Sequence, residues 1–394
     1  MSHDPVVILS YARTPMGGFQ GDLAPVSATQ LGSAAVKAAV ERADVQPDAI
    51  DQIYMGCVLS AGLSQAPARQ AALGAGLPLS VAATTVNKMC GSGMQAAMFA
   101  HDAIVAGSAD VVVAGGMESM TNAPYLLLKH RGGARIGHDS IKDSMYFDGL
   151  EDAYVPGKLM GAIAEDAARA HNFSREAQDD YALESLSRAR AAIDSGAFDR
   201  EVVPVEVQTR AGVQTITIDE QPPKGRPDKI PGLKAAFAKD GTITAANASS
   251  ISDGAAALVM TRQSVAAAMG LTPVARVLAH SVFAHEPGQF PTAPVPAIQK
   301  VLQKAGWTLD DVDLFEVNEA FACVAMIAMQ DLNIPHSKFN VNGGATALGH
   351  PIGASGARIL VTLLAAMQNR GARRGIAALC IGGGEATAMA VELI

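Results

Sequence analysis

The chain has 394 residues, a length that predicts two or three compact units rather than one simple core. Hydrophobic residues make up 49% of it, and Ala and Gly are abundant, which suits closely packed layers of helices and sheet. The formal net charge is −8 and no run of Lys or Arg stands out. We therefore expect no nucleic-acid partner, although an acidic protein can still hold an anionic small molecule locally.

Within the first 120 residues, short apolar strands alternate with helical patterns. Strand-like runs occupy residues 6–10, 53–55, 84–87 and 110–114, and the last of them ends at Gly115-Gly116. Helical spacing marks residues 29–43, 65–76 and 92–106. This alternation predicts an α/β fold with a largely layered β/α sheet.

The middle of the chain differs in character from both ends. Residues 121–248 are polar and turn-rich, with a charged helical pattern at 174–195 and several prolines after it. We interpret them as an inserted loop domain between an N-terminal half, 1–120, and a C-terminal half, 249–394. The C-terminal half returns to strand-like runs near 255–261, 274–280, 312–317 and 376–381, with helices between them.

Three sequence matches relate the two halves at a nearly constant separation. The pairs are "DQIYMG" (51–56) with "DLFEVN" (313–318), "CGSG" (90–93) with "GASG" (353–356), and "VVVAGGMESM" (111–120) with "ALCIGGGEATAM" (378–389). Such a repeat predicts two topologically similar halves related by a pseudo-twofold axis. Corresponding loops of the two halves would then meet at one site.

The four cysteines are widely spaced and include no CxxC pair: Cys57, Cys90, Cys323 and Cys380. A disulfide framework is therefore not expected, and a reducing cytoplasm is the expected compartment. No apolar stretch reaches the length of a membrane span, so we expect no membrane association. The N-terminal residues lack the basic and apolar regions of a secretory signal.

The segment "NKMCGSGMQAA" (87–97) places Cys90 between a predicted strand and a predicted helix. Backbone N–H groups at a helix start favour an anion, so this position would lower the pKa of the thiol and raise its thiolate fraction. The alternative is a packed, inert thiol, which is the usual state of a lone cysteine. We interpret Cys57 and Cys323 as core residues of that kind.

His350 lies in the glycine-rich segment "GGATALGHPIGASGAR" (343–358), which the repeat places opposite the Cys90 loop. A cysteine nucleophile needs a base within hydrogen-bond reach, and a histidine that caps a turn is the alternative. Cys380 ends a strand before Gly382-Gly383-Gly384, whose N–H groups can form an oxyanion hole. A thiol there can act as acid or base, or it can be a core residue before a flexible turn.

In "FEVNEAFA" (315–322), Asn318 and Glu319 separate an apolar strand from a helix. Asn318 can orient water or bind a carbonyl, and Glu319 can cap the helix start. Helix capping alone is the alternative for both residues.

Taken together, these segments resemble the thiolase family, and the resemblance covers essentially the whole chain. The segments "NKMCGSGMQA", "VNEAFA", "NGGATALGHPIGASGAR" and "LCIGGGEA" look like the family's four site segments in the same order. Residues 54–78 and 242–259 are similar to the branch of acetoacetyl-CoA thiolases, the acetyl-CoA C-acetyltransferases. The resemblance implies a thiolase-like, five-layered α-β-α-β-α core built from two duplicated halves, with an inserted loop domain.

The same resemblance implies a reaction and a role for each site residue. The reaction is the reversible Claisen condensation of two acetyl-CoA molecules to acetoacetyl-CoA and CoA, by a ping-pong mechanism through an acyl-Cys90 intermediate. His350 would activate Cys90, and Cys380 would deprotonate the second acetyl-CoA. Asn318 would hold a water that forms one oxyanion hole with His350. The backbone N–H groups of Cys90 and Gly382 would form the other.

The resemblance also implies that coenzyme A lies over the loop domain. Ser249 would be near the pantetheine arm, with Arg226 and Lys229 near the adenine nucleotide, and a solvated loop charge is the alternative for Arg226. The resemblance implies no metal and no cofactor other than coenzyme A thioesters as substrates. It also implies a homotetramer, assembled as a dimer of dimers.

Two departures from the family pattern bear on specificity. Leu159 stands where many members have a histidine that lines the acyl pocket, which makes the expected pocket more apolar. Phe290-Pro291 resembles the pair found in members that also accept 2-methyl-branched substrates. A broader-specificity or branched-chain 3-ketoacyl-CoA thiolase of fatty-acid β-oxidation is therefore the alternative function.

Three other functional classes fit the sequence less well. A ketoacyl synthase also uses a cysteine, but it pairs that residue with two histidines or with His and Asn, so Cys380 argues against it. A non-catalytic acyl-CoA-binding or lipid-binding relative would be expected to lack one of the four reactive residues, and all four are present. A nicotinamide dehydrogenase is disfavoured because no GxGxxG segment follows the first strand.

Overall fold

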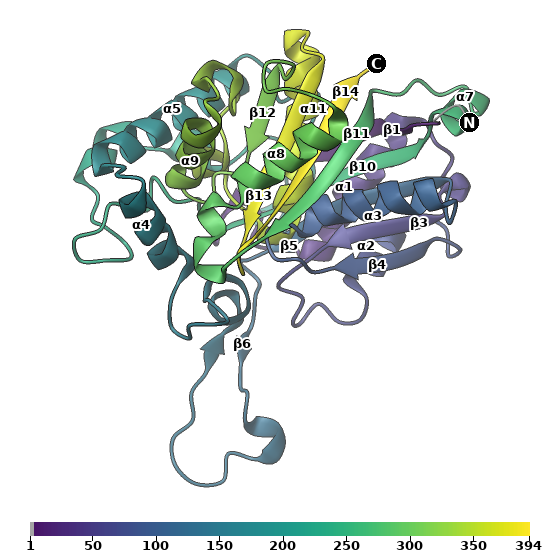
Figure 1. Ribbon diagram of the computed structural model, residues 1–394. Helices are drawn as coiled ribbons and strands as arrows, with labels where there is room; N and C mark the ends of the chain where they lie inside the picture. The colour runs from purple at the N-terminus through teal and green to yellow at the C-terminus, as the bar shows by residue number, and fades with distance from the viewer. Residues whose placement is uncertain (1–3) are drawn as a thin grey trace.

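The computed structural model describes residues 4–394, and the strands of its large sheet divide into two groups that meet along one edge (Figure 1). The first group contains β1 (Val6–Arg13), β3 (Gln52–Gly56), β4 (Ala82–Val86), β5 (Val111–Ser119) and β10 (Ser252–Arg262). The second contains β11 (Ala275–Ala284), β12 (Leu314–Val317), β13 (Arg374–Ile381) and β14 (Glu385–Leu393). The hydrogen-bonded order is β12-β13-β14-β11-β1-β10-β5-β3-β4. At the junction, β1 and β11 share two paired positions, Val7–Arg276 and Ile8–Ala275.

Four strands of the first group and the four strands of the second have the same order and directions, so the predicted internal repeat is confirmed; β4 is an additional edge strand of the first group. In the first group β3 runs parallel to β4 and β5, and β10 lies antiparallel between β5 and β1. In the second, β12 runs parallel to β13, and β14 lies antiparallel between β13 and β11. Strand β10 of the first group follows the inserted segment in the chain, so it lies within residues 249–394, which were predicted to form only the other half.

Helices cover both groups and fill the space between them, which gives the expected α-β-α-β-α layers. The outer face of the first group packs on α1 (Ala28–Ala43) and α2 (Pro67–Gly74). The outer face of the second packs on α8 (Pro294–Ala305) and α9 (Ala322–Leu332). Between the groups lie α3 (Ser92–Ala106) and α11 (Ile352–Arg370), which share one apolar core with strands of both (Figure 1).

The two central helices cross at a reciprocal pair of glycines. A Cβ added to Gly93 would lie 2.6 Å from the backbone nitrogen of Ala357, and one added to Gly356 would lie 2.4 Å from that of Met94. Neither position has room for a side chain, because each glycine meets the other helix's backbone. The matched "CGSG" and "GASG" segments therefore allow the close approach that brings the Cys90 and His350 loops together.

The sheet extends further than the sequence patterns predict. Strand β5 continues through Gly115 and Gly116 to Ser119 and does not end at the glycine pair. A Cβ at Gly115 would lie 2.2 Å from the carbonyl oxygen of Ala256, so glycine lets neighbouring backbones approach here rather than breaking the strand. Strand β14, which returns after the glycine turn that follows β13, has no counterpart among the predicted strands.

The inserted segment forms its own set of elements beside the second group of strands. Its long charged helix, predicted at 174–195, is α5 (Arg175–Asp194), and Ser174 caps it by accepting a hydrogen bond from the N–H of Ala177. The segment also contains elements outside the predictions: α4 (Met160–Ala170), the hairpin of β8 (Val205–Thr209) and β9 (Gly212–Ile216), and the π-helical turn Met145–Leu150. Shorter elements of the chain are β2 (Gly17–Gly18), α6 (Gln221–Lys224), α7 (Gln263–Ala268) and α10 (Ala345–Leu348).

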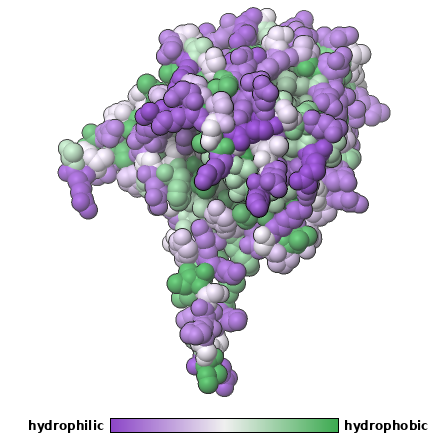
Figure 2. Space-filling view, turned by 90° about the vertical axis from the view of Figure 1, so that its left-hand side faces the viewer, coloured by the Kyte–Doolittle hydropathy of each residue, from purple (hydrophilic) through white to green (hydrophobic). Residues whose placement is uncertain are grey.

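An arm projects from the body around β6 (Tyr125–Leu126) and β7 (Lys142–Asp143) (Figure 1). The arm exposes apolar side chains, and Ile136 has 97% of its surface accessible. Figure 2 shows this narrow projection with hydrophobic residues at its end. Among residues 4–394, no helix is long and apolar enough to cross a membrane.

Candidate active site

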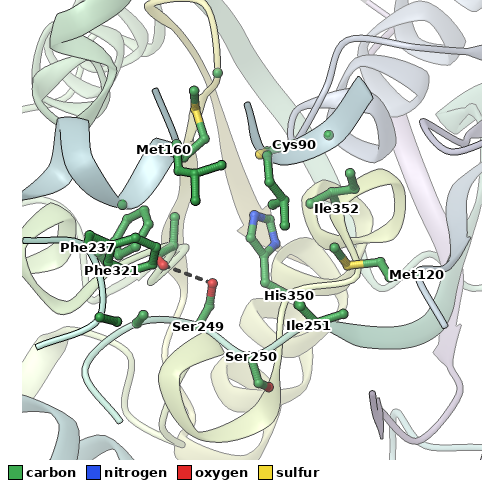
Figure 3. A pocket seen from close by; sticks show the side chains of 18 of the residues that line it. Cys90, Met120, Met160, Phe237, Ser249, Ser250, Ile251, Phe321, His350 and Ile352 are labelled. Carbon is green, nitrogen blue, oxygen red and sulfur yellow. Dashed lines mark hydrogen bonds between the residues drawn. The ribbon is translucent and has the colours of Figure 1, made fainter. Parts of the chain in front are cut away.

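A cavity of about 350 Å³ opens where loops of both halves meet the inserted segment. Cys90, His350, Cys380, Gly382 and Ser249, all singled out from the sequence, line it. Figure 3 shows Cys90 and the imidazole of His350 side by side in this cavity, with Ser249 on a neighbouring loop. The tertiary fold therefore gathers around one cavity residues that lie as much as 292 positions apart, from Cys90 to Gly382.

The loop before α3 has a strained shape that presents Cys90 to the cavity. Met89 adopts a left-handed conformation with φ of +48°, which is unfavourable for a residue with a side chain. The Ser92 hydroxyl accepts a hydrogen bond from the N–H of Lys88 at 2.8 Å and donates to the Met89 carbonyl at 2.6 Å. A Cβ added to Gly91 would lie 2.4 Å from the Cδ1 atom of Ile381, so a side chain at this position would force Ile381 to move. Side-chain hydrogen bonds thus hold the strained turn that carries the thiol.

The Cys90 thiol is protonated in the resting protein, contrary to the expectation of a lowered pKa. Burial raises its pKa to about 11, although the backbone N–H groups of Gly382 and of Cys90 itself act in the opposite direction. Glu118 adds a further unfavourable negative charge. The N–H groups of Cys90 and Gly382 nevertheless lie at the sulfur, next to the place where the carbonyl oxygen of an acyl group on Cys90 would become negatively charged.

The imidazole of His350 is neutral, and one of its nitrogens is held by Ser355. Burial, followed by the charge of Arg358, lowers the pKa of His350 to about 3. Nδ1 lies 2.5 Å from the Ser355 hydroxyl, which itself donates to the Pro351 carbonyl at 2.8 Å. Because that hydroxyl has one hydrogen, it accepts from Nδ1–H, and the lone pair of the ring is left on Nε2. This tautomer suits a base that receives a proton at Nε2.

Asn318 lies behind His350, at the end of β12. Its Nδ2 is 3.5 Å from both ring nitrogens of His350. Its Oδ1 is 3.4 Å from a guanidinium nitrogen of Arg358, and a second nitrogen of Arg358 is 3.0 Å from Glu316. An arginine can only donate hydrogen bonds, so it turns the amide oxygen of Asn318 toward itself and the amide N–H groups toward His350. Ser355 and Arg358 stand within the quoted segment "GASGAR", but no spacing rule singles them out.

Cys380 and Gly382 occupy the end of β13 and the turn that follows it. Gly383 and Gly384 have φ of +97° and +86°, a region that favours glycine, and a Cβ at Gly384 would lie 2.5 Å from the His285 carbonyl oxygen. The turn therefore requires these glycines. Burial raises the pKa of the Cys380 thiol well above its usual value, and the neighbouring Cys90 adds to this effect. The second thiol is also protonated at rest.

The buried carboxylate of Glu118 links the loop after β3 to the start of α11. This residue was not identified from the sequence. It accepts hydrogen bonds from the N–H groups of Val58, Leu59 and Gly353 at 3.1, 3.1 and 2.8 Å. The thiol of Cys57, buried as expected, also approaches it at 3.7 Å. Burial raises the pKa of Glu118 to about 7 in spite of these donors. The quoted segment "GGMESM" contains this residue, but a lone Glu at a strand end predicts no partner.

The wall of the cavity opposite Cys90 is apolar. Leu159 and Met160 at the start of α4 line it, together with three aromatic rings, Phe237, Phe290 and Phe321. Figure 3 shows Met160, Phe237 and Phe321 on one side of the cavity and Cys90 with Ile352 on the other. Leu159 thus lines the cavity, as the resemblance implies for the histidine that it replaces.

The residues expected to contact coenzyme A lie in two places. Ser249 lines the cavity, and its hydroxyl donates to the Ala320 carbonyl at 2.8 Å. Arg226 and Lys229 are exposed at the turn Pro227–Gly232 and are not among the residues that line the cavity. The structure therefore brings Ser249, but not the two cations, next to the reactive groups.

Glu319 does not cap α9, the helix that follows it in the chain, so that expectation is wrong; its carboxylate instead accepts from the N–H of Thr346 in the first turn of α10 at 3.1 Å. Helix α9 begins at Ala322 after Phe321 without a side-chain cap. The Glu319 carboxylate also accepts hydrogen bonds from the hydroxyls of Tyr181, Ser185 and Thr346 at 2.8, 2.8 and 2.7 Å. The buried acid ties α5 of the inserted segment to the loop that precedes His350.

Two family models match the chain. The model described as thiolase, N-terminal domain, matches residues 6–264, and the model described as thiolase, C-terminal domain, matches residues 271–393. These matches leave only short segments of the chain outside them.

Individual proteins match over nearly the full length. Acetyl-CoA acetyltransferase of Cupriavidus necator is 49% identical over 389 residues, which cover 98% of this chain and 99% of the relative. Acetyl-CoA acetyltransferase 2 of Arabidopsis thaliana is 50% identical over 392 residues, which cover 99% of this chain and 97% of the relative. The crystal structure of the Bacillus anthracis acetyl-CoA acetyltransferase matches with a TM-score of 0.97 at 40% identity and covers 99% of both chains.

Proposed function

The chain belongs to the thiolase family, and from that premise we propose that it is an acetyl-CoA C-acetyltransferase. It condenses two acetyl-CoA molecules reversibly to acetoacetyl-CoA and CoA. Relatives that carry this name match the chain over nearly its whole length, which supports the assignment. The observation that carries it is the convergence of two thiols, Cys90 and Cys380, with His350 on one cavity.

In the first half-reaction, Cys90 takes the acyl group. Nε2 of His350 accepts the thiol proton as the sulfur attacks the thioester carbonyl, and the negative charge that develops on oxygen is stabilised by the N–H groups of Cys90 and Gly382. The bond from the carbonyl carbon to the sulfur of CoA then breaks. The departing thiolate receives the proton from His350, which leaves an acetyl-Cys90 thioester and free CoA.

In the second half-reaction, Cys380 acts on a new acetyl-CoA. Its thiol first passes its proton to Nε2 of His350, and the resulting thiolate removes a proton from the methyl group. The enolate oxygen is stabilised by the Nε2–H of His350 and by a water held on Asn318. The enolate carbon attacks the acetyl-Cys90 carbonyl and forms the carbon–carbon bond. Cys90 leaves as a thiolate, which recovers a proton from Nε2 of His350, and acetoacetyl-CoA is released.

A broader or branched-chain 3-ketoacyl-CoA thiolase of fatty-acid metabolism is the second candidate. It is favoured by the apolar wall, in which Leu159 replaces a polar histidine and Phe290 packs nearby. An apolar wall binds extra methylene or methyl groups, but it discriminates between chain lengths by only about 10- to 200-fold. Relative kcat/KM values for acetoacetyl-CoA, 2-methylacetoacetyl-CoA and longer 3-ketoacyl-CoAs distinguish the two candidates.

Coenzyme A would bind across the inserted segment toward the cavity. Ser249 is close enough to the reactive groups for the pantetheine arm, and exposed Arg226 and Lys229 are available to the anionic nucleotide end. Both reactive thiols must stay reduced, which supports a cytoplasmic location. The projecting arm exposes Ile136 and other apolar side chains (Figure 2), which supports a homotetramer in which copies of the chain cover one another's arms.

The decisive experiment compares thiolysis of acetoacetyl-CoA, 2-methylacetoacetyl-CoA and longer 3-ketoacyl-CoAs by wild type, Cys90→Ser and Cys380→Ser. We expect the highest kcat/KM with acetoacetyl-CoA. Cys380→Ser should still form acetyl-Cys90 from acetyl-CoA, detected by mass spectrometry, but should not condense. Full activity of Cys90→Ser would contradict the mechanism, and a preference for long chains would favour the second candidate.

A further inference from the structure

The second part of α3 carries two polar residues that meet a histidine from the other half of the molecule. His101 and Asp102 lie on α3, and His280 lies on β11. Asp102 Oδ1 is 3.1 Å from His101 Nδ1 and 2.9 Å from His280 Nε2, and the two ring nitrogens are 3.2 Å apart. Two imidazole nitrogens and one carboxylate oxygen therefore form a nearly equilateral triangle.

This triangle has the dimensions of one face of a metal coordination shell. Zinc binds imidazole nitrogen and carboxylate oxygen at about 2.0–2.2 Å. Neighbouring ligands around such an ion are then about 3.0 Å apart in octahedral geometry and about 3.4 Å apart in tetrahedral geometry. The three observed separations fall between 2.9 and 3.2 Å, so an ion above the triangle would reach all three atoms with little movement.

We propose that His101, Asp102 and His280 form a binding site for a divalent transition-metal ion such as Zn²⁺. Two imidazoles with one carboxylate are a ligand set that such ions prefer, and water would complete the coordination. The site is open to loading from solvent, because the Asp102 side chain is 58% exposed while the histidines are 19% and 17% exposed. Asp102 supplies the negative charge that offsets Lys304, whose ammonium group donates to the His280 carbonyl at 2.9 Å.

The site would be structural rather than catalytic. With a rise of 1.5 Å per residue, His101 lies about 14 Å along α3 from Ser92 at the helix start, away from the Cys90 thiol. One ligand element, α3, belongs to the first half of the molecule, and the other, β11, to the second. An ion held here would join the two halves and stabilise the folded state in proportion to its binding.

The test is titration of metal-free protein with ZnCl₂ by isothermal titration calorimetry, after alkylation of Cys90 so that the reactive thiol cannot take the metal. We expect one Zn²⁺ per chain and a rise in the thermal unfolding midpoint with excess Zn²⁺. His101→Gln and His280→Gln should each weaken binding at least about tenfold and remove the rise in midpoint. Asp102→Asn, which changes a largely exposed side chain, should fold like wild type, keep its activity without metal and lose affinity as the histidine variants do.

A matched control and a spectroscopic readout make the result specific. His171 lies 3.8 Å from Asp331 and, among residues 4–394, belongs to no cluster of three possible metal ligands, so His171→Gln should bind Zn²⁺ as wild type does. Zinc-edge X-ray absorption should show a nitrogen and oxygen shell at about 2.0–2.1 Å. A sulfur shell at about 2.3 Å, absence of stoichiometric binding by wild type, or unchanged affinity in the three cluster variants would overturn the proposal.

Discussion

The hydroxyl of Ser355 lies 2.5 Å from Nδ1 of His350, and this contact sets the tautomer of the imidazole in the cavity. The same hydroxyl donates its hydrogen to the Pro351 carbonyl, so it receives the hydrogen of Nδ1. The base that faces Cys90 is thus prepared by a residue that does not line the cavity itself. A proton can reach His350 only at Nε2 without breaking this arrangement.

Removal of that hydroxyl should impair proton transfer. Ser355→Ala leaves Nδ1–H without its acceptor, so the ring can change tautomer or rotate, and we expect kcat to fall about 100-fold, within the range that general base catalysis contributes. Circular dichroism should show a folded protein, and Ser355→Thr, which keeps the hydroxyl, should recover part of the activity. The pH profile of kcat should change as well. A loss confined to KM would contradict a role in tautomer selection.

The reactivity of Cys90 should be low at neutral pH in the absence of substrate. Because burial raises the pKa of its thiol to about 11, the thiolate fraction and hence the alkylation rate by iodoacetamide should rise about tenfold per pH unit from pH 7 to pH 10. Mass spectrometry of the modified peptide identifies the site, and Cys90→Ser gives the background. A rate that levels off below pH 8 would mean that His350 already holds the proton at rest.

Leu159 should control which acyl groups the cavity accepts. Leu159→His restores the polar residue that many thiolases have, and it should raise the ratio of kcat/KM for acetoacetyl-CoA over 2-methylacetoacetyl-CoA by about tenfold, because a buried polar group disfavours added methyl groups. Leu159→Met, which keeps an apolar side chain of similar size, is the matched control and should leave the ratio unchanged. An equal effect of both variants would point to packing rather than polarity.

Glu118 should make stability depend on pH. Its pKa is raised from 4.5 in the unfolded chain to about 7 by burial, so the folded state binds the additional proton between these values. Stability therefore falls as pH rises from about 4.5 to about 7, by about 3 kcal/mol from this group. Urea unfolding of wild type and Glu118→Gln across this range should show the fall in wild type and a smaller slope in the variant. Parallel curves would contradict the raised pKa.

The internal repeat and the candidate reactive residues could be predicted from the sequence, because short continuous segments are enough to identify both. The helix at residues 92–106 and most strands follow from periodicity that each segment carries by itself. The glycines beside Cys90 and Cys380 mark turns for which only local backbone geometry matters. Cys90, His350 and Cys380 could be predicted as reactive residues because each is a thiol or an imidazole that lies close to glycines in the sequence.

The state of those groups was decided by the tertiary structure. A helix start predicted a low pKa for Cys90, but burial between two sheets outweighs the N–H groups and keeps the thiol protonated. The partners of His350 and Asn318, namely Ser355 and Arg358, carry no local signal, because a hydrogen bond depends on where a folded backbone directs each side chain. Burial and long-range contacts are properties of the assembled layers, so residue order alone determines which groups are present, and packing determines how they ionise.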